Sequence, residues 1–249
     1  MKTKQLILVI NGKGGVGKSF FAVNFVQYLK DYSVEHWAID TDNENSTLKR
    51  FHSEADFIDL QDAQEMDRIF LALEQHDLVV VDCRAASTDV FLDYFGEIDL
   101  FSVLNELNTG LTVVSPINHE ADSLEQLRVI TDTLQGNAQY VVVKNESHST
   151  KFRLYDDSKI RQKILDEFDG VELILPRMQD WLVTSLNESN VTASAATNGR
   201  LLSLVDRQRL KNWLKHFEMQ VGNAGKRLFT RIENVTDEST EQITMKDIS

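Results

Sequence analysis

A glycine-rich turn between a buried strand and a helix limits the folds that this chain can adopt. The stretch Val9–Phe21 reads VINGKGGVGKSFF and holds four glycines and two lysines. A continuous apolar run, Gln5–Ile10, leads into the turn, and apolar residues at helical spacing follow it. Glycines let successive backbone N–H groups curl around an anion, and the helix N-terminus adds partial positive charge. The spacing of glycine, lysine and serine over Gly12–Ser19 therefore predicts a phosphate-binding loop.

Strand-like and helix-like segments alternate along the chain. Short apolar runs recur at Glu35–Ile39, Leu78–Val81, Leu111–Val114, Tyr140–Val143 and Val171–Leu175. Helical patterns lie between them, at Asp62–Glu74, Ala121–Leu134 and Ser158–Phe168. This rhythm predicts an α/β fold with a single doubly wound, mostly parallel sheet and helices on both faces. Ligands of such sheets bind beyond the carboxyl ends of the strands, so residues that directly follow a strand are candidate site residues.

Two lysines occupy the glycine-rich turn, although a phosphate cradle needs only one. The sequence KGGVGKS that starts at Lys13 resembles the deviant Walker A motif KGGxGK[ST] of the ParA/MinD family of P-loop ATPases. The resemblance covers about Gln5 to Arg177 and implies a P-loop NTPase fold with ATP and Mg²⁺ as cofactors. It implies that Lys18 binds the phosphates of its own ATP, whereas Lys13 reaches across a homodimer to the partner's phosphates. The nucleotide-binding residues that it implies here are Gly12, Lys13, Gly14, Gly15, Val16, Gly17, Lys18, Ser19 and Phe20.

Three aspartates follow strand-like runs, where a magnesium–nucleotide site needs carboxylates. Asp40 and Asp42 come directly after one run, and Asp82 ends another. The resemblance implies that Asp42 orients or activates the attacking water, and that Asp40, Asp82 and Ser19 surround the magnesium ion. A solvated turn or a strand-end cap is the structural alternative for these aspartates. The family's usual glycine is absent after Asp82, where Cys83 begins the sequence CRAA, and we expect Cys83 to be a packed thiol.

Two further positions are candidates for binding the adenine base. Asn145 follows the strand-like run Tyr140–Val143, and its amide can both donate and accept a hydrogen bond. The resemblance implies that Asn145 bonds the base and that the backbone near Pro176 flanks it. Asparagine is also common in loops, so a purely structural role for Asn145 stays open.

Charge is unevenly distributed along the chain. The net charge of −13 argues against a strongly nucleic-acid-binding surface over the whole molecule, yet Thr197–Arg231 holds eight basic and two acidic residues. The stretch 201–220 predicts a helix whose apolar face consists of Leu210, Trp213, Leu214, Phe217 and Val221. The candidate DNA-binding residues form a basic stripe on another face, namely Arg207, Lys211 and Lys215, with Arg200 on the same side if the helix extends that far. A solvated helix face is the alternative.

The resemblance to the ParA/MinD family implies an ATP hydrolase that is slow, Mg²⁺-dependent and stimulated by an adaptor protein. The ParA-like interpretation is an ATP-dependent homodimer that binds nonspecific DNA and positions or segregates plasmid DNA, or supports its transfer. The alternative is a MinD-like positioning ATPase with a protein cargo, for which Gly225–Ile232 is a short candidate membrane anchor. The acidic tail after that segment disfavours a membrane. Nitrogenase-like relatives need bridging cysteines, and Cys83 is the only cysteine.

The sequence gives no sign of a membrane span or a signal peptide. We therefore expect a cytoplasmic protein, associated with the nucleoid if it binds DNA. We also expect one ATPase domain over residues 1–233, with the basic C-terminal helices included, and a flexible acidic tail over residues 234–249.

Overall fold

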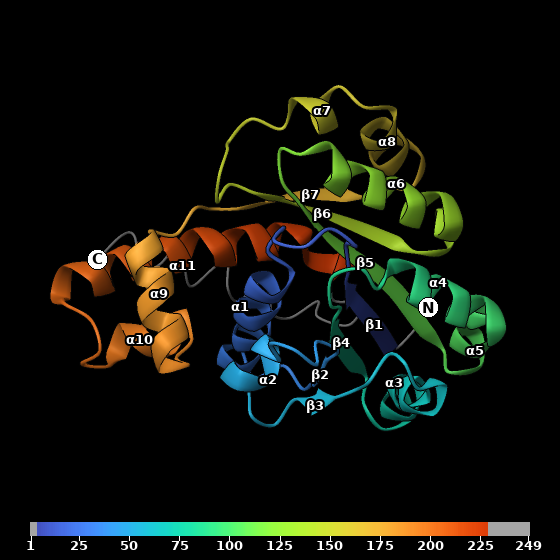
Figure 1. Ribbon diagram of the computed structural model, residues 1–249, viewed down its shortest axis with the longest axis horizontal. Coiled ribbons are helices and arrows are strands. Elements are labelled where there is room, and N and C mark those ends of the chain that lie inside the picture. Colours follow the sequence, from blue (N-terminus) through green and yellow to red (C-terminus); the bar gives the residue numbers. More distant parts are fainter. Residues whose placement is uncertain (1–3, 229–249) are drawn as a thin grey trace.

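A seven-stranded sheet forms the centre of the molecule (Figure 1), and every pair of neighbouring strands is parallel. The computed structural model describes residues 4–228. The strands are β1 (Lys4–Val9), β2 (Trp37–Asp40), β3 (Asp56–Phe57), β4 (Leu78–Asp82), β5 (Thr109–Ile117), β6 (Gln139–Asn145) and β7 (Val171–Leu175). Their order, β3-β2-β4-β1-β5-β6-β7, places β1 at the centre with crossovers in both directions. The predicted doubly wound sheet is therefore confirmed, and over the described residues it is wholly parallel.

Helices cover both faces of this sheet. They are α1 (Lys18–Asp31), α2 (Thr47–Phe51), α3 (Ala63–Gln75), α4 (Thr88–Glu97), α5 (Leu100–Glu106), α6 (Ala121–Leu134), α7 (Arg153–Asp156), α8 (Lys159–Gln162), α9 (Asp180–Ser189), α10 (Ala193–Asn198) and α11 (Leu204–Ala224). One hydrophobic core joins the sheet to α1, α2, α9, α10 and α11, and a second joins the other face to α3 through α8. Strands between two cores are buried on both sides, which explains the continuous apolar runs of the sequence.

Several predicted helix boundaries agree with the structure. The helix at Ala121–Leu134 is found with those bounds, and α3 begins at Ala63 because the Asp62 side chain accepts a hydrogen bond from the Gln64 N–H, 2.9 Å away. The predicted helical segment Ser158–Phe168 is also found, with Ser158 as its N-cap and Phe168 as its C-cap, but only its first part is α-helical. There, α8 is followed directly by a π-helical turn, Lys163–Glu167. In a π-helix the backbone hydrogen bonds join residues five apart, whereas in an α-helix they join residues four apart.

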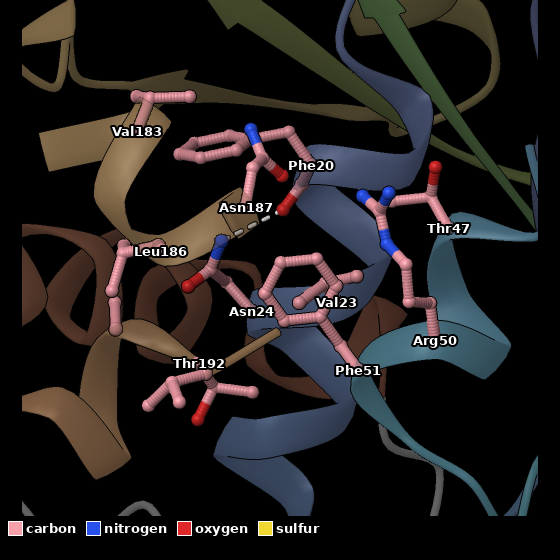
Figure 2. Close-up of a pocket in the computed structure, with 12 residues that line it drawn as sticks. Phe20, Val23, Asn24, Thr47, Arg50, Phe51, Val183, Leu186, Asn187 and Thr192 are labelled. Atoms are coloured by element: carbon pink, nitrogen blue, oxygen red, sulfur yellow. Dashed lines mark hydrogen bonds between the residues drawn. The ribbon is translucent and has the colours of Figure 1, made fainter. Parts of the chain in front are cut away.

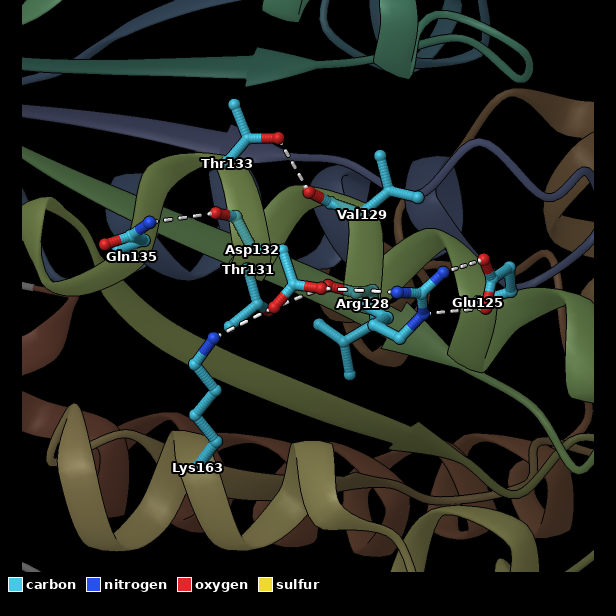
Figure 3. A network of polar contacts seen from close by, with 9 residues as sticks. Glu125, Arg128, Val129, Thr131, Asp132, Thr133, Gln135 and Lys163 are labelled. Carbon is cyan, nitrogen blue, oxygen red and sulfur yellow. Dashed lines mark hydrogen bonds and ion pairs between the residues drawn. The ribbon is translucent and has the colours of Figure 1, made fainter.

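A charged network ties the outer face of α6 to this π-helical turn (Figure 3). Arg128 contacts Glu125 and Asp132 on α6, and Lys163 approaches Asp132 to 2.9 Å. These groups are largely exposed, so the network contributes little to stability and mainly fixes how the segment lies along α6.

The C-terminal helix α11 presents its predicted apolar face to the core. Leu210, Trp213, Phe217 and Val221 are buried, and Leu214 is half-buried against the same core. The indole N–H of Trp213 donates to the carbonyl of Pro176 at 2.8 Å. This contact fixes the helix against the end of β7.

Two members of the predicted basic stripe do not contribute to its exposed part. Ser203 caps α11, so the helix starts at Leu204 and Arg200 stays in the preceding turn, outside the stripe. Arg207 donates a hydrogen bond to the carbonyl of Gly199 at 2.6 Å, which ties its side chain to that turn. Lys211 and Lys215 are exposed on α11, so the exposed stripe is shorter than predicted.

The candidate membrane segment is only partly described. Leu228 is fully buried in the core, and Arg227 is paired with Asp169, so this part of the segment packs on the protein. The rest of that segment, residues 229–232, and the predicted tail, residues 234–249, lie outside the described residues. Over residues 4–228 the structure contains no helix that is long and apolar enough to span a bilayer.

Candidate nucleotide site

The glycine-rich loop connects β1 to α1 at the carboxyl edge of the sheet. Gly15 and Gly17 have φ angles of 75° and 97°, which is the left-handed region that glycine adopts without strain. A Cβ atom at Gly17 would lie 2.4 Å from Nδ2 of Asn145. The predicted loop is thus folded around its glycines, and successive N–H groups at the start of α1 suit an anionic ligand.

The two lysines of the loop have different surroundings. Lys18 is 6% exposed, and its ammonium donates to the carbonyl of Lys13 at 3.0 Å. Burial lowers the pKa of Lys18, and Asp82 acts in the opposite direction. The Lys13 ammonium lies at the surface, 3.1 Å from Asp122 and 3.3 Å from Glu120 at the start of α6, and Asp122 is the main cause of its raised pKa. The role of Lys13 across a dimer stays a prediction.

Asp82 ends β4 as a buried carboxylate, with Lys18 and Ser19 of the phosphate loop as its nearest favourable neighbours. Both of its oxygens lack a hydrogen bond within the described part of the chain, and Asp40 stands beside it in register on β2. Burial, and then the charge of Asp40, raise the pKa of Asp82 to about 8. An unpaired buried carboxylate is costly, and a magnesium ion with its water molecules would supply both charge and hydrogen bonds. The residues present therefore fit the predicted ion.

Protein side chains alone do not enclose a metal here. Among residues 4–228 no cluster of three or more His, Cys, Asp or Glu side chains is placed to hold one. Magnesium commonly keeps several waters and binds through one or two protein groups together with substrate phosphates. Ser19 and Asp82 would contribute those protein groups. The positive ion would also offset the electrostatic repulsion between the buried carboxylates of Asp40 and Asp82.

Asp82→Asn is expected to stabilise the protein when magnesium and nucleotide are absent. Because the folded pKa of about 8 lies above the unfolded value, the stability that Asp82 contributes is present at low pH. It is lost as the pH rises toward about 8, whereas an asparagine does not titrate. In urea unfolding, the free energy of unfolding of Asp82→Asn should therefore exceed that of the unaltered protein by an amount that grows as the pH rises. With MgATP bound, the unaltered protein should instead be the more stable of the two. If the stability difference without ligand does not change with pH, the raised pKa of Asp82 is wrong.

Asp40 and Asp42 build the loop that leads into α2. The two carboxylate oxygens of Asp40 accept hydrogen bonds from the N–H groups of Asp42 and Lys49, at 2.9 and 3.0 Å. Asp42 accepts from the N–H groups of Glu44 and Asn45, at 3.0 and 3.2 Å. The structure brings both aspartates to the same edge as Asp82, and it adds a turn-forming role that sequence reasoning missed.

A threonine between these aspartates connects two loops of the site. The Thr41 hydroxyl donates to the backbone carbonyl of Asp82 at 3.0 Å and accepts from the N–H of Arg84 at 3.0 Å. A lone threonine gives no signal in the sequence for such a link. Cys83 is fully buried, as expected for a packed thiol, and burial raises its pKa.

The loop after Asp82 contains a residue in an unfavourable backbone conformation. Ala86 has a φ of 54°, and its N–H donates to the carbonyl of Gly12 at 2.9 Å. The contact connects this loop to the phosphate loop. A left-handed conformation costs roughly 1–2 kcal/mol for a residue with a Cβ atom.

Ala86→Gly is therefore expected to raise the free energy of unfolding by about 0.5–1 kcal/mol, after the added freedom of the unfolded chain is subtracted. Urea unfolding measures the effect. Ala72→Gly in the regular helix α3 is the matched control, and it should instead destabilise by about 1 kcal/mol. Equal losses in both variants would show that Ala86 is not strained.

A cavity of about 370 Å³ adjoins the phosphate loop. It brings together five predicted nucleotide-binding residues, namely Gly15, Gly17, Phe20, Asn145 and Pro176. Sequence reasoning missed the other residues that line it, which are Ser147, His148, Met178, Asp180, Val183 and Thr184. The Asn145 amide donates to the carbonyl of Val16 at 2.8 Å and accepts from the Ser147 N–H at 3.0 Å. Asn145 thus fixes the phosphate loop, and its contact with a base stays a prediction.

Comparison with known families identifies this arrangement. A family model described as CbiA, the CobQ/CobB/MinD/ParA nucleotide binding domain, matches residues 7–237. The chain belongs to this CobQ/CobB/MinD/ParA family. The resemblance drawn from the two-lysine motif is therefore confirmed, and the protein is a P-loop nucleotide-binding protein of the ParA/MinD ATPase type.

Individual relatives agree with this membership. Protein MobD of Acidithiobacillus ferrooxidans is 30% identical over 216 residues, which cover 84% of this chain and 93% of that protein. The septum site-determining protein MinD of Pyrococcus horikoshii, solved with Mg-ADP, matches 90% of this chain and 99% of its own at a TM-score of 0.53 and 13% identity. A putative plasmid partition protein of Borrelia burgdorferi, bound to AMPPNP, matches 88% and 99% at a TM-score of 0.50 and 15% identity. The two solved structures show the shared fold.

Proposed function

We propose that this ParA/MinD-family protein hydrolyses ATP slowly, with Mg²⁺, and forms a homodimer through its nucleotide site when ATP is bound. The observation that carries the proposal is the placement of the two lysines. Lys18 closes over the phosphate loop, whereas the Lys13 ammonium lies at the surface beside it. This ammonium is held only by exposed ion pairs with Glu120 and Asp122, which it could exchange for the phosphates of a second molecule. Charge supplied in trans would make dimerisation depend on the bound phosphates.

The hydrolytic step requires little covalent chemistry from the protein. The loop would hold the phosphates, and Lys18 would bear part of the developing negative charge. Asp42 would position the attacking water, and magnesium, held by Ser19 and Asp82, would neutralise phosphate oxygens. The half-buried Asp42 carboxylate accepts hydrogen bonds from backbone N–H groups of its own loop. Because these hydrogen bonds do not tie the carboxylate to the rest of the protein, the loop could move as a unit toward the phosphates.

The dimer would bind DNA without sequence preference and position or segregate plasmid DNA, or support its transfer, with turnover stimulated by an adaptor protein. Lys211 and Lys215 are exposed on α11, and a dimer doubles this patch. The fold shared with a putative plasmid partition protein is consistent with this cargo. Such a protein would associate with the nucleoid.

The proposal is tested by measuring ATP hydrolysis and molecular mass with MgATP, MgADP and no nucleotide. ATP-dependent dimers and slow hydrolysis would support it. A chain that neither dimerises nor hydrolyses ATP would contradict it. Binding to anionic vesicles, with no binding to DNA, would instead favour the MinD-like alternative.

Lys211→Glu is expected to weaken ATP-dependent binding to random-sequence duplex DNA. Each dimer loses two cations, so the slope of log affinity against log salt should fall by about two. Fluorescence anisotropy over a salt series measures both quantities. Lys159→Glu on α8, an exposed lysine with the same charge change, is the matched control. If both variants weaken DNA binding equally, the effect comes from the net charge of the protein and not from a binding site on α11.

A further inference from the structure

A second cavity, of about 500 Å³, lies between α1, α2, α9 and α10 (Figure 2). Most of its wall is apolar, formed by Phe20, Val23, Phe51, Val183, Leu186, Val191 and Ala193. Phe20 and Val183 also line the cavity beside the phosphate loop, so two side chains are common to both cavities. Apart from these two side chains, no residue of the apolar wall has a role in the proposed binding or hydrolysis of ATP, so the wall can contact another ligand.

Polar groups stand on opposite sides of this cavity. Figure 2 shows Arg50 of α2 on one side and Asn187 of α9 on the other. The Arg50 guanidinium lies 5.5 Å from the centre of the Phe51 ring, and no carboxylate of residues 4–228 forms an ion pair with it. Asn24 of α1 also lines the cavity, and its amide donates to the carbonyl of Phe20 at 2.8 Å. The cavity thus combines an apolar wall with two amides and one exposed guanidinium that has no ion pair within residues 4–228.

We propose that this cavity docks a partner protein through a short segment that carries bulky apolar side chains next to acidic residues. The apolar side chains would fill the wall, and a carboxylate would pair with the planar guanidinium of Arg50. The amides of Asn24 and Asn187 would bond the peptide backbone of the segment. The volume falls within the roughly 300–1,000 Å³ of sites that bury a ligand.

Docking at this cavity would reach the aspartates of the nucleotide site. The helix α2, which carries Arg50, is held to Asp40 by the Lys49 N–H at 3.0 Å. Ser46, at the start of the same helix, donates to the carbonyl of Asp42 at 2.7 Å. A ligand that shifts α2 would therefore move the loop of Asp40 and Asp42. This coupling rests on the proposed ATP hydrolysis, whereas docking itself does not.

The test uses the full chain and a fluorescein-labelled peptide that alternates leucine and phenylalanine with glutamate and aspartate. Anisotropy without nucleotide should show binding to the unaltered protein, and Arg50→Glu should weaken it by roughly tenfold or more. Arg153→Glu, with the same charge change on exposed α7, should bind as the unaltered protein does. Val191→Phe, which fills the cavity from the turn after α9, should also weaken binding. A peptide with lysine in place of its acidic residues should bind only to Arg50→Glu.

The outcomes separate docking from the proposed function. No binding of the acidic peptide, or equal binding to the Arg50→Glu and Arg153→Glu variants, overturns the docking site. Binding of octanoate without any binding of the peptide also overturns it, in favour of a small amphiphile. A bound peptide that changes ATP turnover supports both docking and coupling. A chain that binds the peptide but never hydrolyses ATP retains the docking site and refutes the proposed function.

Discussion

Asp42→Ala is expected to lower ATP turnover by roughly two orders of magnitude while ATP binding is retained. The phosphates would still be held by the glycine-rich loop and Lys18, neither of which depends on the Asp42 carboxylate for its position. The attacking water would lose the carboxylate that orients it. ATP-bound dimers should consequently accumulate, and a phosphate-release assay with a mass measurement would record both effects.

The turn around Asp42 provides a sharper version of this test. The carboxylate also accepts hydrogen bonds from the N–H groups of Glu44 and Asn45, so alanine removes a structural contact as well. Asn in place of Asp42 keeps an oxygen acceptor for the turn but carries no negative charge. If Asp42 acts on water, Asp42→Asn should be as slow as Asp42→Ala. Normal turnover in either variant would refute the role.

Much of the fold was predictable because it depends on local patterns. Strands buried between two layers of helices appear as uninterrupted apolar runs, as in β4, and amphipathic helices such as α6 and α11 show their spacing directly. The edge strand β3 has two residues and no apolar run, so it left no signal. The phosphate loop is also a local pattern, because its glycines, lysine and serine lie within eight consecutive residues, Gly12–Ser19, and it could therefore be placed from the sequence.

Features that depend on contacts with turns or with distant segments were not predictable from the sequence. Arg207 was assigned to a basic stripe by its spacing, but the carbonyl of Gly199 in the preceding turn binds it. The amide of Asn145 holds the carbonyl of Val16, far away in the chain. Ala86 adopts a left-handed backbone, although nothing in the sequence marks it, because its N–H bonds Gly12. The contacts of Asn145 and Ala86 join segments that only the folded sheet brings together, whereas the contact of Arg207 depends on how the turn before α11 folds.

Lys13→Ala is expected to abolish ATP-dependent dimerisation and to leave ATP binding by the single chain largely intact. The Lys13 ammonium lies outside the cradle that Lys18 closes, so its loss should not open that cradle. Cations supplied in trans to a transferring phosphoryl group are worth roughly 10³–10⁵ in rate, so turnover should fall steeply as well. Sedimentation measurements with and without MgATP, together with a turnover assay, would record both losses.

The alternative is that Lys13 only anchors the start of α6 through Glu120 and Asp122, and a matched variant separates the two roles. Glu120→Gln combined with Asp122→Asn removes the same ion pairs and keeps the lysine. These exposed pairs are weak and screened by salt, so their loss should cost the fold little and should release the ammonium for the partner molecule. We therefore expect this double variant to dimerise with ATP at least as well as the unaltered protein. If it instead loses the dimer as Lys13→Ala does, the contact with α6 is what matters and the role in trans is wrong.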